Sequence, residues 1–280
     1  MKTDGRRKSS NVEDRRGRSG GGAIALGGGG LGIVGIILFL LLGGNPTDLL
    51  DNASVSEPEQ PYVETEQDKE LADFVSVVLA DTEDIWTELF QQQDLQYENP
   101  TLVLFTGQVQ TACGFGSAAA GPFYCPGDRK LYIDLEFYDE LQSSFKAPGD
   151  FAMAYVIAHE VGHHVQTLLG ISDQVMPLRQ KMSETEFNKY LVRFELQADY
   201  FAGVWAHHAQ GLGYLEQGDL QEAITAAGAV GDDTIQKRAR GYVVPESFTH
   251  GTAKQRIYWF EHGFELGTIK GGDTFSETER

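Results

Sequence analysis

The sequence predicts an α+β fold, mainly helical with a small β-sheet, preceded by one transmembrane helix. Three observations lead to this prediction. Apolar residues recur every three or four positions in several long segments, two short segments between them have the composition of strands, and one run near the start carries no charge. At 280 residues the chain has room for one sizeable domain with appendages.

The front of the chain differs from the rest in composition. Residues 1–22 hold seven Lys or Arg against three Asp or Glu, with many Ser and Gly, which indicates a basic, disordered cytoplasmic tail. Residues 23–44 carry no charge and reach the ~20 residues that a membrane-spanning helix needs. A cleaved signal peptide is the alternative, but the apolar run is long for one and no clear small-residue cleavage site follows.

The charge flanking this run predicts its orientation. Because the basic residues precede it, the positive-inside tendency places Met1 in the cytoplasm and the domain after residue 44 outside the cell membrane. The remainder of the chain has 15 basic and 38 acidic residues, a net charge of −23. This domain is therefore an improbable partner for nucleic acid or an anionic lipid surface.

The elements follow in order along the chain. Residues 45–67 are rich in Pro, Glu, Ser and Asp and predict a linker, residues 68–267 predict the folded domain, and residues 268–280 predict a loose polar tail. The expected helices are Leu71–Phe90, Phe151–Leu169, one from a capping box at Ser183 to Gly211, Leu220–Val230 and Ala253–Leu266. The expected strands are Thr101–Val109 and Leu131–Leu135.

The chain contains two cysteines, Cys113 and Cys125, close together in a loop-rich segment. An extracytoplasmic domain favours a disulfide between them. Metal ligation is the weaker alternative, because one thiol pair without a nearby His cluster does not complete a tetrahedral site.

The sequence Ala158-His159-Glu160-Val161-Gly162-His163 carries the strongest chemical signal. On a helix, His159 and His163 share one face and can hold one zinc ion, with Glu160 beside them as a base. A pair of core histidines bonded to backbone carbonyls is the alternative, but two imidazoles and a carboxylate are costly to bury unpaired. His164 lies about 100° around the helix from His163, so we expect it to be a polar packing residue.

A catalytic zinc ion needs a third protein ligand and an open fourth position. Glu195 and Asp199 share the inner face of the helix that begins at Ser183. Glu195 is the expected third ligand, and Asp199 is expected to accept the distal N–H of His159 and fix its tautomer. The alternative is a surface carboxylate face, although the apolar neighbours indicate that the stretch is covered.

These motifs resemble a known family. H-E-V-G-H-H followed by E-L-Q-A-D-Y-F-A-G is similar to the membrane-anchored neutral zinc metallopeptidases of bacteria and, more distantly, to gluzincins of the prenyl-protein protease type. The resemblance covers roughly residues 70–266 and implies a zincin-like fold, a Zn²⁺ cofactor, a peptide or protein substrate, the ligands His159, His163 and Glu195, and Glu160 as general base. It also implies a substrate-pairing edge strand, for which Gly116–Tyr124 is the candidate.

A late segment, Ser247–Arg256, resembles the region of gluzincins near the active site in which T-H is followed, after four or five residues, by R-I. This implies catalytic, oxyanion-binding roles for His250 and Arg256. Gly251 stands where the distant relatives often have proline. The alternative for Arg256 is a buried ion-pair anchor, and for His250 a cap of the last helix.

The predicted function is hydrolysis of peptide bonds by a zinc-activated water with Glu160 as general base. The main alternative is a catalytically silent zincin-fold binding or assembly factor tethered to the membrane. A purely structural zinc site would need a fourth protein ligand, and His207, His208 and Cys113 lack a suitable spacing. The sequence leaves the physiological substrate and the oligomeric state open.

Overall fold

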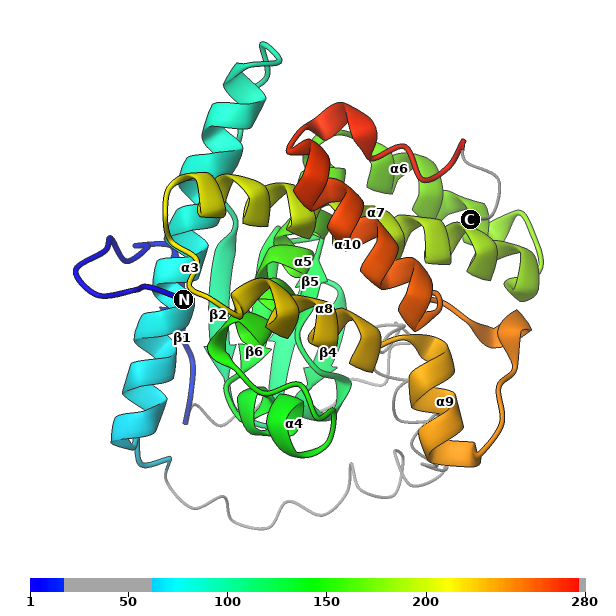
Figure 1. The fold of residues 1–280 in the computed structure, drawn as a ribbon. Coiled ribbons are helices and arrows are strands. Elements are labelled where there is room, and N and C mark those ends of the chain that lie inside the picture. Colours follow the sequence, from blue (N-terminus) through cyan, green and yellow to red (C-terminus); the bar gives the residue numbers. More distant parts are fainter. Residues whose placement is uncertain (18–61, 277–280) are drawn as a thin grey trace.

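A four-stranded sheet lies at the centre of the computed structural model, which describes residues 1–17 and 62–276 (Figure 1). Its strand order is β1 (Val12–Asp14), β2 (Thr101–Phe105), β6 (Lys130–Asp134), β5 (Phe123–Cys125). The first three strands run parallel and β5 runs antiparallel to β6. β2 and β6 are buried along nearly their whole length, as parallel strands covered on both faces require.

The first 17 residues belong to this fold, which corrects the prediction of a disordered tail for that part of residues 1–22. β1 pairs with β2 from Val12 opposite Leu102 to Asp14 opposite Leu104. Figure 1 shows this segment in blue beside α3 (Glu66–Gln91). Several of the basic side chains that suggest disorder instead form ion pairs with acidic residues of the domain, as Lys8 does with Asp73 at 2.6 Å and Arg7 with the buried Glu83 at 3.0 Å. Composition could not reveal these partners because they lie about seventy residues away.

The predicted transmembrane segment, residues 23–44, lies outside the described residues, as does most of the predicted linker. Within residues 1–17 and 62–276, no helix has the length and apolar content that crossing a membrane requires. The mainly helical α+β class is confirmed, and the transmembrane helix stays a prediction.

The predicted helices of the domain are present with small shifts at their ends. They are α3, α5 (Asp150–Leu168), α7 (Glu184–Gly211), α8 (Asp219–Ala229) and α10 (Ala253–Leu266). Capping boxes start α7 at Ser183 and α10 at Thr252. Three further helices were not predicted because they are short or strongly polar: α4 (Phe137–Ser143), α6 (Ile171–Val175) and α9 (Asp232–Arg240).

The predicted strand Thr101–Val109 is split in two. Gly107 turns the chain with a φ of 68°, and its N–H donates to the Asp134 carboxylate at 2.8 Å. β3 (Gln108–Thr111) then pairs antiparallel with β4 (Gly114–Ser117) in a separate ribbon. Gly116–Tyr124 is therefore not one strand, since the helical turn Ala118–Ala120 interrupts it before β5.

A disulfide between Cys113 and Cys125 joins the end of this ribbon to β5, which confirms the predicted pairing. Its sulfur atoms are 1.98 Å apart, and Cys125 is fully buried.

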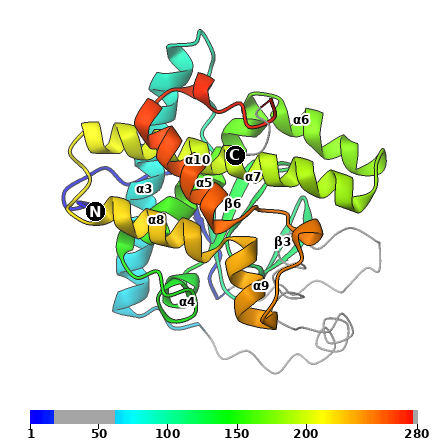
Figure 2. The same ribbon diagram turned by 45° about the vertical axis from the view of Figure 1, so that its right-hand side comes forward.

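Close backbone contact sets the arrangement of α5, α7 and α10. A Cβ on Gly162 of α5 would lie 2.8 Å from the Ala198 carbonyl oxygen of α7. A Cβ on Gly203 would lie 2.0 Å from the Phe260 carbonyl oxygen of α10. The two glycines thus let α7 pack against α5 on one side and α10 on the other, and Figure 2 shows α10 crossing in front of α7. Of these two glycines, Gly162 lies where α5 meets α7, the helices that carry the predicted zinc ligands, whereas Gly203 lies where α7 meets α10.

The end of the chain is also ordered, which corrects the predicted loose tail as far as residue 276. The Thr268 carbonyl oxygen accepts a hydrogen bond from Tyr200 at 2.7 Å. Arg193 donates to the Phe275 carbonyl oxygen at 2.7 Å, and Thr274 donates to that of Arg193 at 2.6 Å. Two of these bonds use backbone carbonyls of the segment and the third uses the Thr274 hydroxyl, so its polar composition does not distinguish docking from disorder.

Candidate metal centre and active site

α5 presents His159, Glu160 and His163 in a nearly closed interior. Their exposed fractions are 6%, 8% and 9%. Most other residues of α5 are buried and apolar, so the sheet and the surrounding helices cover it on nearly every side. The four-residue spacing places both imidazoles on one face, where their ring centroids lie 4.8 Å apart.

α7 brings Glu195 to the same point. Its Oε2 atom lies 3.1 Å from His159 Nε2 and 3.3 Å from His163 Nε2. Tetrahedral zinc with ligands at about 2.1 Å separates its ligand atoms by about 3.4 Å. The three side chains therefore fit a zinc ion, and among the described residues this ligand group has three members, as a catalytic site with an open position requires.

The outer nitrogen of each imidazole has its own partner. His159 Nδ1 lies 2.8 Å from Asp199 Oδ1, the contact that the sequence predicts. His163 Nδ1 lies 2.8 Å from Gln166 Oε1, a residue that the sequence reading did not select. The sequence could have indicated Gln166, because it lies three positions after His163 and therefore near it on the helix surface.

Arg256 of α10 lies behind Asp199. Its Nε donates to Asp199 Oδ2 at 2.8 Å and its Nη2 to Oδ1 at 2.9 Å. Further bonds reach Tyr155 Oη at 3.1 Å and the Val230 carbonyl oxygen at 3.2 Å. These contacts agree with the ion-pair anchor, the alternative to an oxyanion-binding role.

His250 lies in the loop before α10 and is held there by Asp232. One oxygen of Asp232, Oδ2, accepts the backbone N–H groups of Thr249, His250 and Gly251 at 2.8, 2.7 and 3.0 Å. Its other oxygen lies 3.5 Å from His250 Nδ1. The sequence did not point to Asp232, because no helix or strand was predicted for residues 231–252. The helix α10 is capped by Thr252 and not by His250, so the alternative role as a cap is wrong.

The charges of the site act strongly on one another. Burial raises the pKa of Glu160, and this outweighs the opposite influence of His163, His159 and His250. Burial opposes the charged form of His159, but Asp199 and Glu195 prevail and raise its pKa to about 9. Burial also opposes the ionised form of Asp199, yet Arg256 and His159 hold its pKa at about 2. Burial opposes the ionised form of Glu195 too, but His163, His250 and His159 hold its pKa well below the usual range, so Glu195 and Asp199 are carboxylates at neutral pH, a form suited to a cation.

The remaining histidines of the motif regions have other roles. His164 is fully buried between Tyr124, whose Oη lies 3.0 Å from its Nδ1, and the Glu98 carbonyl oxygen, 2.6 Å from its Nε2. It packs against the sheet, as predicted. His207 and His208 bond carbonyl oxygens of Phe264 and Gly267 at the end of α10, and neither joins the ligand group.

Comparison with known proteins agrees with this chemistry. A family model described as "Putative neutral zinc metallopeptidase" matches residues 1–275. The match includes residues 1–17 as well as His159, His163 and Glu195, so nearly the whole described chain resembles that family.

Two relatives illustrate the range of similarity. The uncharacterized protein YpfJ of Escherichia coli strain K12 is 47% identical over 288 residues, covering 99% of this chain and 100% of the relative. The uncharacterized protein Mb2605 of Mycobacterium bovis is 44% identical over 194 residues, covering 65% of this chain and 64% of the relative. No solved structure matches the chain.

Proposed function

The chain belongs to the neutral zinc metallopeptidase family, whose cofactor is Zn²⁺, and we propose from this premise that it hydrolyses peptide bonds. One observation carries the proposal. His159 Nε2, His163 Nε2 and Glu195 Oε2 converge to within hydrogen-bonding distance, and Glu160 is the next residue on the same buried helix. Three ligands with an adjacent base are the requirement for hydrolysis by an activated water.

The reaction follows from the positions of these groups. When bound, zinc lowers the pKa of a water molecule and polarises the scissile carbonyl. Glu160 takes the proton of that water as general base and returns it to the leaving amine as general acid. Burial raises the pKa of Glu160, which makes it a better proton acceptor than an exposed glutamate.

His250 is proposed to stabilise the oxyanion that forms on the carbonyl oxygen. Burial opposes its charged form, but Glu195 and Asp232 raise its pKa, which favours a cation facing the site. Arg256 is proposed to act at one remove, by orienting Asp199 and through it His159.

The proposal is tested with the purified full chain, loaded with one equivalent of zinc and incubated with casein. Glu160→Gln keeps the size of the side chain and removes its basicity, so turnover should fall by a factor of about 10² to 10⁴ while zinc stays bound. Glu184→Gln on the exposed first turn of α7 is the matched control and should cleave as the wild type does. A chelator should abolish cleavage in both active forms.

Two results would contradict the proposal. Cleavage by Glu160→Gln at the wild-type rate would mean that another group is the base. Tight zinc binding without cleavage of any unfolded protein would favour the alternative of a zincin-fold binding or assembly factor. The membrane anchor at residues 23–44 stays a prediction from the sequence.

A further inference from the structure

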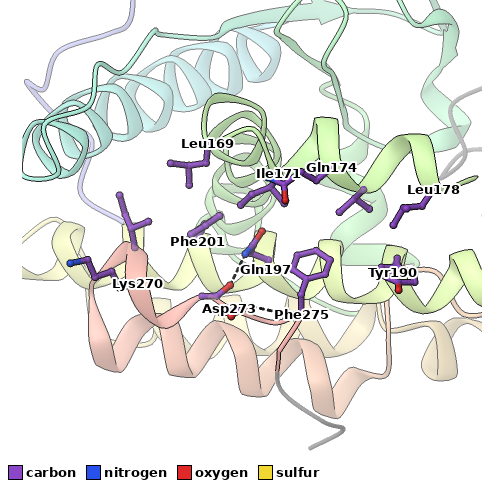
Figure 3. Close-up of a pocket in the computed structure, with 13 residues that line it drawn as sticks. Leu169, Ile171, Gln174, Leu178, Tyr190, Gln197, Phe201, Lys270, Asp273 and Phe275 are labelled. Carbon is purple, nitrogen blue, oxygen red and sulfur yellow. Dashed lines mark hydrogen bonds between the residues drawn. The ribbon is translucent and has the colours of Figure 1, made fainter.

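Two buried glutamines connect the proposed zinc ligand His163 to the C-terminal segment, residues 268–276. Gln166 of α5 is fully buried and Gln197 of α7 is 5% exposed. Gln166 Nε2 donates to Gln197 Oε1 at 3.0 Å, and Gln197 Nε2 donates to the Gly272 carbonyl oxygen at 2.6 Å. Figure 3 shows Gln197 on the wall of a pocket of about 510 Å³, with its amide directed to the C-terminal segment.

The acceptors around Gln166 fix the orientation of its amide. Besides Gln197, its Nε2 donates to the Phe194 carbonyl oxygen at 2.6 Å. Both of these partners are oxygens that can only accept, so both amide protons are used. The Oε1 atom must then face His163 Nδ1, 2.8 Å away, and accept a hydrogen bond from it.

This arrangement decides the tautomer of His163. When Nδ1 carries the proton, the lone pair of Nε2 points toward Glu195 Oε2, 3.3 Å away, where a metal ion would lie. We propose that Gln166 is a positioning residue that makes His163 an Nε2 ligand, and that Gln197 and Gly272 hold Gln166 in place. This inference rests on the proposed zinc site, and it extends the support of that site to the C-terminal segment.

The test measures zinc affinity by competition with a chromophoric chelator, so it does not depend on catalysis. Gln166→Leu keeps approximate volume and removes the acceptor, and zinc affinity should fall by about 10- to 100-fold, as for other outer partners of ligating histidines. Gln197→Leu removes one of the two acceptors that orient Gln166 and should cause a smaller loss. Gln221→Leu, at an exposed position of α8, is the matched control and should bind zinc as the wild type does.

A conservative variant separates positioning from general packing. Gln166→Glu keeps an oxygen acceptor for His163 Nδ1 but loses both donors, so it should retain most of the zinc affinity that Gln166→Leu loses. Affinity within twofold of wild type in folded Gln166→Leu would overturn the inference. If that variant does not fold, Gln166→Asn is measured instead, because its shorter amide cannot reach His163, and unchanged affinity there would overturn the inference equally. Failure of the wild type to bind zinc would refute the proposed function itself.

A separate observation concerns the side of the membrane on which the two ends of the predicted span lie. The N-terminal segment bonds the domain through its backbone: Ser9 N–H donates to the Ser76 carbonyl oxygen at 2.9 Å, and Arg15 N–H to that of Leu104 at 2.8 Å. Two side chains of the segment add ion pairs with the rest of the chain: Glu13 lies 2.8 Å from Lys130, and Arg16 lies 2.8 Å from Glu64.

These contacts require residues 1–17 and the domain to share one compartment. A cytoplasmic Met1 and an extracytoplasmic domain, as the positive-inside tendency predicts, would leave β2 without its β1 neighbour and Glu83 without Arg7, Ser9 and Asn11. We infer that the N-terminal segment lies on the same side of the membrane as the catalytic domain, an arrangement that the predicted single membrane crossing between them does not allow. Its basic residues then serve as partners of acidic residues in the domain and not as a signal that holds Met1 in the cytoplasm.

The test uses single cysteines in the full chain, expressed in bacteria and exposed to a membrane-impermeant maleimide. Cys113→Ser and Cys125→Ser are introduced in the same chain, because the native disulfide would be reduced in the cytoplasm and its thiols would then compete for the reagent. Lys8→Cys on the N-terminal segment and Gln93→Cys beyond α3 occupy exposed positions. We expect the same pattern at both, labelled in intact cells or labelled only after permeabilisation. Opposite patterns at the two sites would overturn the inference.

Discussion

Two buried polar clusters in this protein each contain a glutamate, but they differ in whether a proton donor stands at each contact with that glutamate. Around Glu83, the side chains of Arg7, Ser9 and Asn11 all donate to the carboxylate, so each close contact joins a donor to an acceptor. In the zinc cluster, Asp199 and Gln166 hold the protons of His159 and His163 on their Nδ1 atoms. Both Nε2 lone pairs then face a third electron-pair donor, Glu195 Oε2.

The difference shows how a structural cluster is distinguished from a binding site. The Glu83 cluster is complete without any ion, and its bonds attach the N-terminal segment to α3. Three converging electron-pair donors need positive charge between them, because burying them unpaired is costly: a metal ion, or in the metal-free protein the proton that His159 holds with its pKa raised to about 9. The balance of hydrogen-bond donors and acceptors in a buried cluster thus indicates its role, which burial alone does not.

The largest expected effect removes the glutamate of the zinc cluster. Glu195→Ala deletes a proposed direct ligand, so zinc affinity should fall by more than the ~100-fold that loss of an outer partner causes. Competition with a chromophoric chelator measures this. Glu83→Ala is the control, with unchanged zinc affinity, and a comparable loss in both variants would show that the two clusters do not differ as described.

Removing the cation behind the zinc cluster should cost stability. Arg256→Met leaves the fully buried Asp199 without its main counter-charge, which should lower the free energy of unfolding by about 3–5 kcal/mol. Urea unfolding of the metal-free protein measures the change. Arg256→Lys should recover part of the loss, since it keeps the charge without the two-pronged geometry. A change below 1 kcal/mol in Arg256→Met would mean that Asp199 is compensated from elsewhere.

The comparison extends to two neighbouring histidines of α5. His164 has a protein partner at each ring nitrogen, Tyr124 and the Glu98 carbonyl oxygen, whereas His163 Nε2 faces the proposed metal position beside Glu195. Burial lowers the pKa of His164 from 6.5 to about 4, so the unfolded chain binds a proton in this range that the folded protein does not. Stability due to the neutral imidazole is therefore present above pH 6.5 and is lost as the pH falls toward 4, by about 3 kcal/mol in total.

The measurement compares metal-free wild type with His164→Gln by urea unfolding at pH 7 and pH 4.5. The difference between the two proteins should shrink at the lower pH, because the variant has no imidazole to protonate. A difference that is constant across this range would refute the assignment of a buried, neutral His164.

The smallest effect is expected for the Glu83 cluster. Glu83→Ala leaves Ser9 and Asn11 without their acceptor and should destabilise the protein by about 1–3 kcal/mol. The variant should also expose the N-terminal segment to proteases before the domain is cleaved, which limited proteolysis detects. Unchanged stability together with unchanged protection of this segment would contradict the described docking.

Local sequence determined much of this protein. The spacing of His159 and His163, the capping boxes at Ser183 and Thr252 and the apolar periodicity of five helices depend on residues within a few positions of one another. Glu195 and Asp199 could be placed on one face for the same reason, and the two cysteines had only each other as partners.

Tertiary structure alone decided the remainder, since it depends on pairs that are distant in the chain. The carboxylate of Asp232 collects the N–H groups of a loop some eighteen residues later, and Arg256 reaches Asp199 across 57 positions. The N-terminal segment has the composition of a disordered tail, and contacts with distant residues, such as the acidic residues of α3 and the neighbouring strand β2, give it a fixed place. A charge run or a polar tail is ambiguous by itself, because its free energy depends on which groups the fold brings opposite to it.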